Sequence, residues 1–437
     1  MPQALPSATE VVVIGGGVIG VATAWYLQRL GVPVVLCEKG RIAGEQSSRN
    51  WGWIRKQGRD PAELPLIIES LRLWAEIARE LPEDIGWTVG GVTYLVESDA
   101  DAARYTAWLD QARAYRLDSR MLSVAETHTL LPNVRVAHRG ALFTASDARA
   151  EPALAVPAMA RLLRASGVPV CETCAVRTVE RSGGKVTAVV TEHGRIGCTA
   201  VVLAGGAWSR LLLAHLGFAL PQLQVIASVQ RTGPAPLIAE TALGSAAVAL
   251  RRRADGGYTL ARSGASRAEI VPANLRHARP FLPVLKRDWR QLKFRLGKPF
   301  LDALLEKPWD GDSESPFERT RVLDPPPDHG LLDRVLVAAR AAFPQLAEAR
   351  SVERWAGAID VLPDEIPAIG PVPGINGLVL ATGFSGHGFG IGPAAGKVTA
   401  ELAVGRNPSV DLAAFRVDRF TRVADPAHGD SGRRGGP

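Results

Sequence analysis

The sequence predicts an α/β fold around a parallel sheet, and three stretches of the chain predict it. Residues 11–31 read VVVIGGGVIGVATAWYLQRLG, which is an apolar strand, a glycine turn and a helix. Residues 200–204 are a fully apolar run of the kind that is buried in a parallel sheet. Residues 381–397 read ATGFSGHGFGIGPAAGK, again a strand, a glycine loop and a helix. This order of elements indicates a Rossmann-like sheet.

The first glycines have the spacing of a dinucleotide-binding turn. Gly15 allows a tight turn after the strand, Gly17 lets the backbone approach a pyrophosphate, and Gly20 lets the helix pack on the sheet. The phosphates then meet the positive end of the helix. Glu38 ends the next strand, where its carboxylate can accept hydrogen bonds from both ribose hydroxyls and would repel the extra phosphate of NADP. We expect FAD here, although this segment alone also allows NAD.

The later elements follow from periodicity and turn residues. Helical spacing of apolar residues predicts helices over 63–81, 101–115 and 152–166, with a strand at 91–96. Strands over 168–171, 175–180 and 186–191, with a glycine turn at 183–184, indicate an antiparallel meander. Short β-like pieces at 225–231 and 257–262 lie in an arginine-rich region, and the first fold resumes with a strand at 378–382 and a helix over 393–404.

These elements divide into two domains and a tail. Residues 1–85, 146–219 and 352–423 are expected to form the dinucleotide-binding domain, and residues 86–145 and 220–351 the substrate domain. Residues 424–437 should be a disordered tail.

Composition limits the class of protein. A chain of 437 residues with 46% hydrophobic content can form two or three domains. We find no signal for secretion or a membrane span, and four cysteines are few for this length, so a cytoplasmic location is expected. Cys171 and Cys174 form a CxxC, but it leads into a strand and has no second CxxC, which disfavours redox and zinc roles. The net charge of +7 suits anionic substrates or surfaces without indicating nucleic acid.

Residues 276–298 combine many basic side chains with interleaved leucine, phenylalanine and tryptophan. A helix of this composition can lie on an acidic membrane face or on a partner subunit, which would make the protein peripheral to the inner membrane. The alternative, which we favour from sequence, is a solvated cover over the substrate domain.

Four motifs together resemble the D-amino-acid oxidase family of FAD-dependent oxidoreductases, which includes glycine oxidase, sarcosine oxidase and D-amino-acid dehydrogenases. They are the N-terminal glycine motif with its extension at 44–50, VVLAGGAWS at 201–209, WAGAIDVLPDEIPAIG at 355–370, and the glycine loop at 381–397. The resemblance implies a glutathione-reductase-like FAD domain and an α+β substrate domain whose mixed sheet covers the flavin. It implies oxidation of a C–N bond of an amino acid or secondary amine to an imine, by hydride transfer to flavin N5.

The resemblance also implies roles for individual residues of the FAD site. It implies that Gly15, Gly17 and Gly20 contact the pyrophosphate and that Glu38 binds the ribose. Ser47 and Ser48, with Arg49 and Asn50, would lie along the phosphate and ribityl chain, and the backbone of Val176 would contact the adenine. Gly205 and Trp208 would form the turn beside the dinucleotide, and the flavin pyrimidine would be contacted by Gly386, His387, Gly388 and Phe389.

Two departures from the family pattern carry predictions. Members with covalent flavin use a cysteine near the C-terminal motif or a histidine within 48–52, and this chain has neither, so we expect noncovalent FAD. Sarcosine-oxidase-like members place a lysine where this chain has Gly390, and no lysine occurs between Lys185 and Lys286 to promote reaction with oxygen. We therefore expect a dehydrogenase that passes electrons to a quinone or another carrier at least as much as an oxidase that uses oxygen.

For the small-molecule substrate, Arg55 is the first candidate. A bidentate arginine is the best partner for a carboxylate, and Trp51 and Trp53 would form an apolar wall beside it. Tyr258 lies on an expected strand over the flavin, and His387 is a candidate base, although a structural loop histidine is the simpler assignment.

Other flavoprotein classes give different expectations. A subunit of a multi-subunit dehydrogenase or electron-transfer complex would use 276–298 for docking. An NADPH-dependent monooxygenase needs a second nucleotide fingerprint, and a disulfide reductase needs a CxxxxC after the first strand pair; we find neither in the sequence.

Overall fold

The predicted α/β fold is confirmed. The structure is a computed structural model that describes residues 5–289 and 292–423, so the predicted tail at 424–437 lies outside the described residues. Its first layer is a six-stranded sheet in the order β21-β22-β13-β1-β2-β9, in which β21 alone is antiparallel to its neighbour. The strands are β1 (Val11–Ile14), β2 (Val34–Cys37), β9 (Val170–Cys171), β13 (Ala200–Leu203), β21 (Ala368–Pro371) and β22 (Leu378–Thr382).

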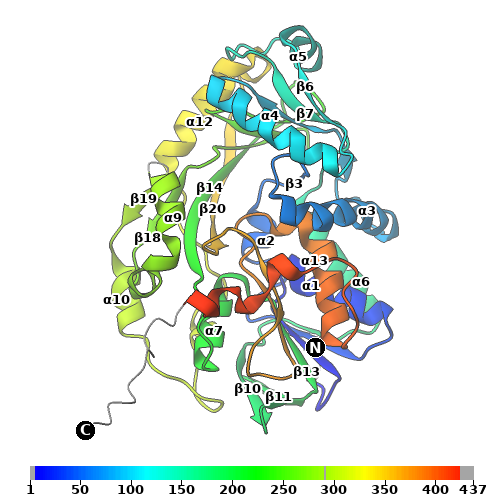
Figure 1. Ribbon diagram of the computed structural model, residues 1–437, viewed down its shortest axis with the longest axis vertical. Helices are drawn as coiled ribbons and strands as arrows, with labels where there is room; N and C mark the ends of the chain where they lie inside the picture. Colours follow the sequence, from blue (N-terminus) through cyan, green and yellow to red (C-terminus); the bar gives the residue numbers. More distant parts are fainter. Residues whose placement is uncertain (1–4, 290–291, 424–437) are drawn as a thin grey trace, which may run out of the picture.

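The helices beside this sheet come from the first 165 residues and from the C-terminal part of the chain (Figure 1). They are α1 (Val18–Arg29), α3 (Leu64–Glu80), α6 (Pro152–Ala165) and α13 (Gly388–Ala403). Helix α1 packs on α13, and α13 packs on α3. A Cβ atom on Gly396 would lie 2.4 Å from the Cβ of Ala22, so a glycine on α13 permits the close approach of the two helices.

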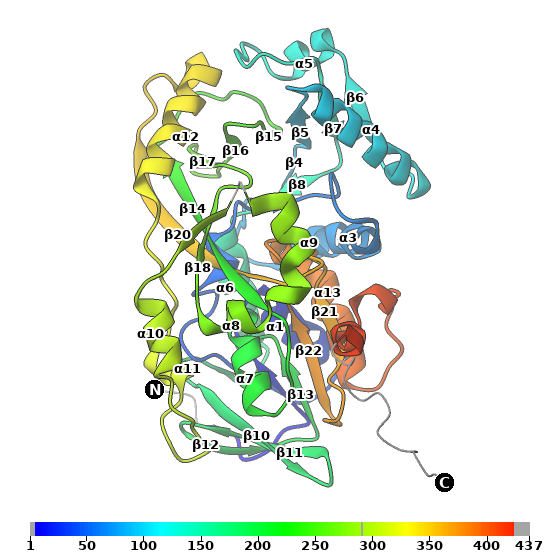
Figure 2. The same cartoon turned by 60° about the vertical axis from the view of Figure 1, so that its left-hand side comes forward.

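The second layer is a ten-stranded mixed sheet that rises above the first (Figures 1 and 2). Its order is β19-β18-β14-β17-β16-β15-β5-β7-β6, with β20 also paired to β14. The strands are β5 (Val92–Leu95), β6 (Ser119–Leu122), β7 (Ala141–Thr144), β14 (Leu223–Thr232), β15 (Ala242–Gly244), β16 (Ala249–Arg252), β17 (Tyr258–Ala261), β18 (Ser266–Glu269), β19 (Leu292–Arg295) and β20 (Ser351–Val361).

Strand β20 is the longest of these and pairs with β14 over its whole length. It therefore belongs to the second sheet, although the sequence-based division gave it to the dinucleotide domain. Its last residues run toward the first sheet, so β20 links the two layers.

Helices cover the second sheet and are fixed by side-chain caps. They are α4 (Asp99–Ala114), α5 (Val124–Leu130) and α12 (His329–Ala342). Ser98 caps α4, Ser123 and Glu126 form a capping box on α5, and the Asp328 carboxylate accepts from Leu331 N on α12. The apolar face of α12 packs on β14 and β17, where Tyr258 and Leu260 are buried.

Two small sheets complete the fold. The antiparallel meander expected after residue 175 is present as β10 (Val176–Ser182), β11 (Lys185–Thr191) and β12 (Gly194–Gly197). A three-stranded sheet joins β3 (Trp53–Ile54), β8 (Ala148–Arg149) and β4 (Thr88–Val89) between the layers. The short helices α2 (Gln46–Arg49), α7 (Ser209–His215) and α11 (Pro316–Arg319) lie in connections.

The region 276–298 is not one continuous helix. The chain forms α8 (Pro272–Arg276), α9 (Ala278–Asp288), β19 and then α10 (Lys298–Leu304), which form an outer layer at one side of the molecule (Figure 1). Within the described residues, no helix is both long and apolar enough to cross a bilayer.

Candidate functional site

The three glycine motifs meet at one cavity of about 460 Å³. It lies at the carboxyl ends of the central strands β1, β2 and β13, where α/β sheets bind their ligands. The predicted cofactor residues that line it are Gly15, Gly17, Glu38, Ser47, Arg49, Asn50, Val176, Gly205, Trp208, Gly386, His387, Gly388 and Phe389. Segments as far apart in the sequence as Gly15 and Phe389 thus line one cavity.

The first turn can be built only from glycine. Gly15 has a φ of +110°, and a Cβ there would lie 2.4 Å from the carbonyl oxygen of Ala204. Gly20 lies outside the cavity lining, and a Cβ there would lie 1.8 Å from the carbonyl oxygen of Gly15. Helix α1 therefore packs directly against the turn, and its N-terminus lies at the cavity. The positive end of the helix dipole at this position favours an anionic pyrophosphate.

Ser47 closes the other side of this turn. Its hydroxyl accepts a hydrogen bond of 2.8 Å from Val18 N, in the first turn of α1. Ser48 is turned away from the cavity lining and donates to the carbonyl of Glu45 at 3.3 Å. The structure thus places Ser47 against the helix end and Ser48 behind it.

Glu38 is fixed at the tip of β2. Its carboxylate accepts hydrogen bonds from Gly16 N at 2.6 Å and from Gly40 N at 2.7 Å. Burial raises the pKa of Glu38 despite these two donors. The carboxylate is held beside the glycine turn, at the position where such folds bind the ribose.

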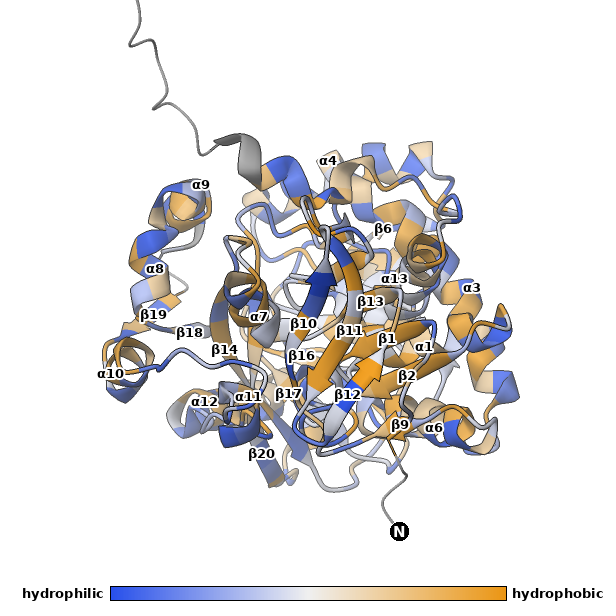
Figure 3. Ribbon diagram, turned by 90° about the horizontal axis from the view of Figure 1, so that it is seen from below, coloured by the Kyte–Doolittle hydropathy of each residue, from blue (hydrophilic) through white to orange (hydrophobic). Residues whose placement is uncertain are grey.

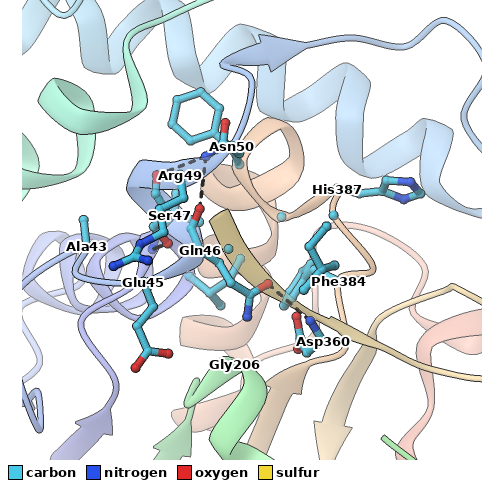
Figure 4. Close-up of a pocket in the computed structure, with 18 of the residues that line it drawn as sticks. Ala43, Glu45, Gln46, Ser47, Arg49, Asn50, Gly206, Asp360, Phe384 and His387 are labelled. Carbon is cyan, nitrogen blue, oxygen red and sulfur yellow. Dashed lines mark hydrogen bonds between the residues drawn. The ribbon is translucent and has the colours of Figure 1, made fainter. Parts of the chain in front are cut away.

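Arg49 and Asn50 shape the segment after α2 (Figure 4). Arg49 donates to the carbonyl of Ala356 at 2.9 Å and pairs with Asp324 at 2.5 Å, which ties α2 to β20. The Asn50 amide donates to the carbonyl of Ser47 at 3.0 Å, and its oxygen accepts from Gly52 N at 2.8 Å. Both side chains therefore hold the backbone that lines the cavity.

His387 is anchored to α3 by a buried carboxylate. Its Nδ1 lies 3.1 Å from both carboxylate oxygens of Glu63, which is 1% exposed. Burial, and then the charge of Arg59, lower the pKa of His387, so its ring is neutral at pH 7. Burial pushes the pKa of Glu63 upward, but His387 and Arg59 outweigh it and the pKa ends below its usual value. Figure 4 shows the ring turned away from the other labelled side chains.

A buried polar network joins the three motifs, and sequence analysis missed it. The Asp360 carboxylate accepts from Gly383 N at 2.7 Å and from the Gln222 amide at 2.9 Å, and Gln222 also donates to the carbonyl of Gly206. Figure 4 shows Asp360 facing Gln46, whose side-chain oxygen accepts from Asp360 N. Burial raises the pKa of Asp360, which is 2% exposed. Only long-range packing identifies this carboxylate as part of the site.

Two arginines from one loop reach the cavity. Arg55 stacks over Tyr94, 5.5 Å from the ring centroid, and donates to the carbonyl of Gln57. Arg59, which sequence analysis did not single out, is 4% exposed, and its Nη1 has no hydrogen-bond partner in the described structure. Burial, and then the like charge of Arg55, lower the pKa of Arg59 to about 10, so it stays cationic at pH 7. Trp51 and Trp53 line the same cavity, with their ring centroids 5.4 Å apart.

Asp147 holds this arginine loop in place. Its carboxylate is fully buried and accepts from Lys56 N at 2.8 Å and Gln57 N at 3.2 Å. The Nζ of Lys56 lies 3.7 Å away. Burial raises the pKa of Asp147 to about 6.

Tyr258 is a correction to the sequence-based assignment. Its side chain is 0% exposed and lies in the core between β17 and α12, and it lines neither described cavity. Its hydroxyl donates to the carbonyl of Pro236 at 3.1 Å and accepts from Ile238 N at 2.9 Å. The placement failed because a short strand does not reveal which of its faces meets the flavin side.

A second cavity of about 750 Å³ adjoins the first and shares Arg55, Tyr94 and Arg262 with it. Within the described residues no cluster of histidine, cysteine, aspartate or glutamate could hold a metal ion. The four cysteines are free and buried.

Comparison with protein families gives a match over residues 10–402 to the FAD dependent oxidoreductase family that is abbreviated DAO. The chain belongs to this family. The resemblance inferred from the motifs is thereby confirmed, and so is FAD as the cofactor of the family. The glycine turn, the helix end and the fixed Glu38 carboxylate fit that dinucleotide.

Related proteins of known function are similar over almost the whole chain. Glycine oxidase of Pseudomonas aeruginosa is 28% identical, over 93% of this chain and 98% of its own length. Sarcosine dehydrogenase of Mus musculus is 26% identical over 96% of this chain, which spans only 42% of that longer protein. Among solved structures, L-amino acid deaminase from Proteus myxofaciens in complex with anthranilate has a TM-score of 0.92 and 32% identity, covering 96% of this chain and 95% of that one.

Proposed function

We propose that this family member oxidises the C–N bond of an amino acid or secondary amine to an imine. The observation that carries the proposal is the convergence of three glycine motifs and two arginines on one cavity. The similarity to glycine oxidase and to L-amino acid deaminase supports it, since the substrates of both are amino acids. FAD, when bound, supplies the acceptor for the hydride.

The chain's own residues bind and orient the substrate. Arg55 and Arg59 present guanidinium groups to the cavity, and a substrate carboxylate would pair with them. Trp51, Trp53 and Tyr94 exclude water beside that position. His387 stays neutral and donates Nδ1–H to Glu63, which leaves Nε2 as a proton acceptor. His387 is therefore the candidate base of the proposed reaction.

The cofactor is noncovalent in this proposal. Two cysteines line the cavity, Cys37 and Cys174, and both lie with Glu38 and Val176, at the end assigned to the adenosine. Acid-precipitated protein should release its yellow colour into the supernatant, and colour that stays with the precipitate would contradict noncovalent binding.

The decisive experiment compares arginine variants under anaerobic conditions. Bleaching of the FAD-loaded protein by D- and L-amino acids, N-methyl amino acids, cyclic imino acids and polyamines would define the substrate. Arg55→Ala and Arg59→Ala should each raise the substrate concentration for half-maximal bleaching about tenfold to hundredfold with FAD retained, because a charge-assisted bidentate contact is lost. Arg116→Ala, an exposed arginine outside both cavities, is the matched control. Equal behaviour of all three variants would remove the arginines from the proposal.

A second candidate is a flavoprotein subunit of a larger dehydrogenase or electron-transfer complex. Sarcosine oxidase subunit beta of Rhizobium meliloti, 26% identical over 94% of this chain, supports it, and so does the exposed outer layer. A purified chain that bleaches with substrate and passes electrons to an artificial dye argues for an independent enzyme. A chain that binds FAD but bleaches with no compound argues for the subunit.

Location and contacts are part of the same proposal. We place the protein in the cytoplasm, peripheral to the inner membrane, with 276–298 as its contact surface. Fractionation of cells would test this, since the protein should leave the membrane fraction at high salt.

A further inference from the structure

The outer layer formed by α8, α9, α10, β18 and β19 is the most exposed apolar part of the molecule. Figures 1 and 3 show it at one edge, and it joins the body through pairing of β18 with β14. Helix α8 packs on α9 and α10, and β18 pairs with β19. The layer is therefore a connected substructure with its outer side toward solvent.

Half of the large apolar side chains that are exposed in the described structure belong to this layer. Eight of the sixteen lie between residues 275 and 305. They are Leu275, Leu282, Trp289, Phe294, Leu296, Leu301, Leu304 and Leu305. Leu275 is 69% exposed, Leu296 67% and Leu305 77%. A soluble monomer rarely concentrates exposed apolar groups in this way unless the surface has a partner.

The same layer carries an excess of positive charge. Arg276, Arg279, Lys286 and Arg295 are exposed and form no ion pair with a described residue. Among the acidic side chains that the structure describes in and next to this layer, Asp302 pairs with Lys298 at 2.7 Å, Glu269 with Arg267 at 2.8 Å, and Glu306 with Arg319. The free charge of this surface is therefore positive.

We infer that this layer docks on the surface of a lipid bilayer that contains anionic lipids. Leucine, tryptophan and phenylalanine enter the interface between headgroups and acyl chains, while lysine and arginine extend to the phosphates. A second copy of this chain would bring the same basic surface against itself, and like charges at an interface are costly. Interfaces between proteins also tend to exclude lysine from an apolar patch, whereas this patch mixes the two.

Docking here would place the second cavity beside the bilayer. Ser266 and Arg267 of β18 and Lys293 of β19 line that cavity, which shares Arg55 and Arg262 with the site already described. Strands β18 and β19 of the layer thus form a wall of the adjoining cavity, while the exposed leucines lie on α8, α9 and α10 or directly after β19 and α10. Membrane attachment would fix the orientation of both cavities relative to the bilayer and would not itself be part of the reaction.

The test uses the full-length FAD-loaded protein and vesicles. Co-sedimentation is measured with vesicles of phosphatidylcholine alone and of phosphatidylcholine mixed with phosphatidylglycerol, at salt concentrations from about 0.1 M to about 1 M. Binding should require phosphatidylglycerol and disappear at high salt. The variant Arg279→Gln, Lys286→Gln, Arg295→Gln should bind about a hundredfold more weakly, because each basic residue near an anionic surface contributes about a factor of five.

Two further variants separate charge from apolar insertion and from general effects. Leu296→Gln with Leu305→Gln should weaken binding while leaving its salt dependence in place. The control Arg135→Gln, Arg181→Gln, Lys185→Gln removes the same charge from exposed positions outside the layer and should bind like the parent. Amine-dependent dye reduction without vesicles should be the same for all variants, so its failure would count against the proposed function and not against docking.

The inference is overturned if the parent fails to sediment with phosphatidylglycerol vesicles at low salt. It is also overturned if the control variant weakens binding as much as the charge variant does. Self-association in gel filtration that Leu296→Gln with Leu305→Gln abolishes would assign the surface to a second copy and would equally exclude the bilayer.

Discussion

Replacing Gly20 by alanine tests whether the glycine turn is required for sterics alone. The new Cβ would lie 1.8 Å from the carbonyl oxygen of Gly15 and 3.3 Å from a methyl of Val13. A carbon and an oxygen in contact are normally about 3.2 Å apart, so helix or strand must move by about 1.4 Å. Gly15 has no room to move away from the new methyl group, because a Cβ built on Gly15 would lie 2.4 Å from the carbonyl oxygen of Ala204. Helix α1 cannot retreat freely, because Ala22 meets Gly396.

This overlap sets the expected magnitude. Overpacking a rigid core costs about 1–3 kcal/mol, and backbone on both sides puts this site at the upper end. We expect Gly20→Ala to lower the free energy of unfolding of the FAD-free protein by about 3 kcal/mol, measured by urea denaturation. Displacement of α1 should also weaken FAD binding about a hundredfold or more, measured by flavin fluorescence, since each tenfold corresponds to about 1.4 kcal/mol.

Gly330→Ala is the matched control, because Gly330 also lies in the first turn of a helix, α12. A Cβ there meets nothing closer than 3.7 Å, so the substitution should stabilise the protein by up to about 1 kcal/mol and leave FAD binding unchanged. The reasoning is refuted if Gly20→Ala folds and binds FAD as the parent does, or if both substitutions have the same sign.

Three further substitutions probe single contacts of the site. Asp147 has a raised pKa of about 6 against 3.8 in the unfolded chain, so the folded state holds the extra proton between these values and loses stability as the pH rises through them. The stability of the parent relative to Asp147→Asn should therefore fall by about 2 kcal/mol from pH 4 to pH 6 in urea unfolding, and a flat difference would rule out the buried carboxylate as its cause. Glu63→Gln should raise the FAD dissociation constant about tenfold, because a charge-assisted contact to His387 is lost; an unchanged constant would show that this anchor does not position the loop. Tyr258→Phe should cost about 1–3 kcal/mol of stability with turnover unaffected, whereas slower turnover at full stability would restore it to the catalytic residues.

The sequence predicted the parts of the fold that local spacing encodes. The turn at 15–20 needs glycine for its own geometry, and apolar runs such as 200–204 belong to buried parallel strands wherever they occur. Helix α13 begins at Gly388, five residues before the expected start, because its glycines at 388, 390 and 392 hide the helical pattern. Such glycines are placed by contacts with Phe384 and Val18, which no local pattern contains.

The buried charges of the site could not be predicted in this way. The sequence does not distinguish Arg59 from Arg55. Arg59 is a buried cation only because Trp108 and Glu63 pack around it. Asp360 lies in β20, in a stretch that the sequence analysis used only as a family motif, and its partners Gln222 and Gly383 come from elsewhere in the chain. The cost of burying such groups, and hence their roles, depends on partners far away in sequence.

The parallel sheet has a consequence for synthesis of the protein. Among the strands of this sheet β1 is made first although it is central, and it lacks its neighbour β13 until residue 203 has been made. The sheet is complete only after β22, and α13 follows later still. One edge of this apolar sheet, first on β1 and later on β13, thus stays unpaired while most of the intervening chain is translated. We expect chaperones to protect the nascent chain, and the flavin to enter after release from the ribosome. Truncation before α13 should yield aggregates in place of a smaller folded domain.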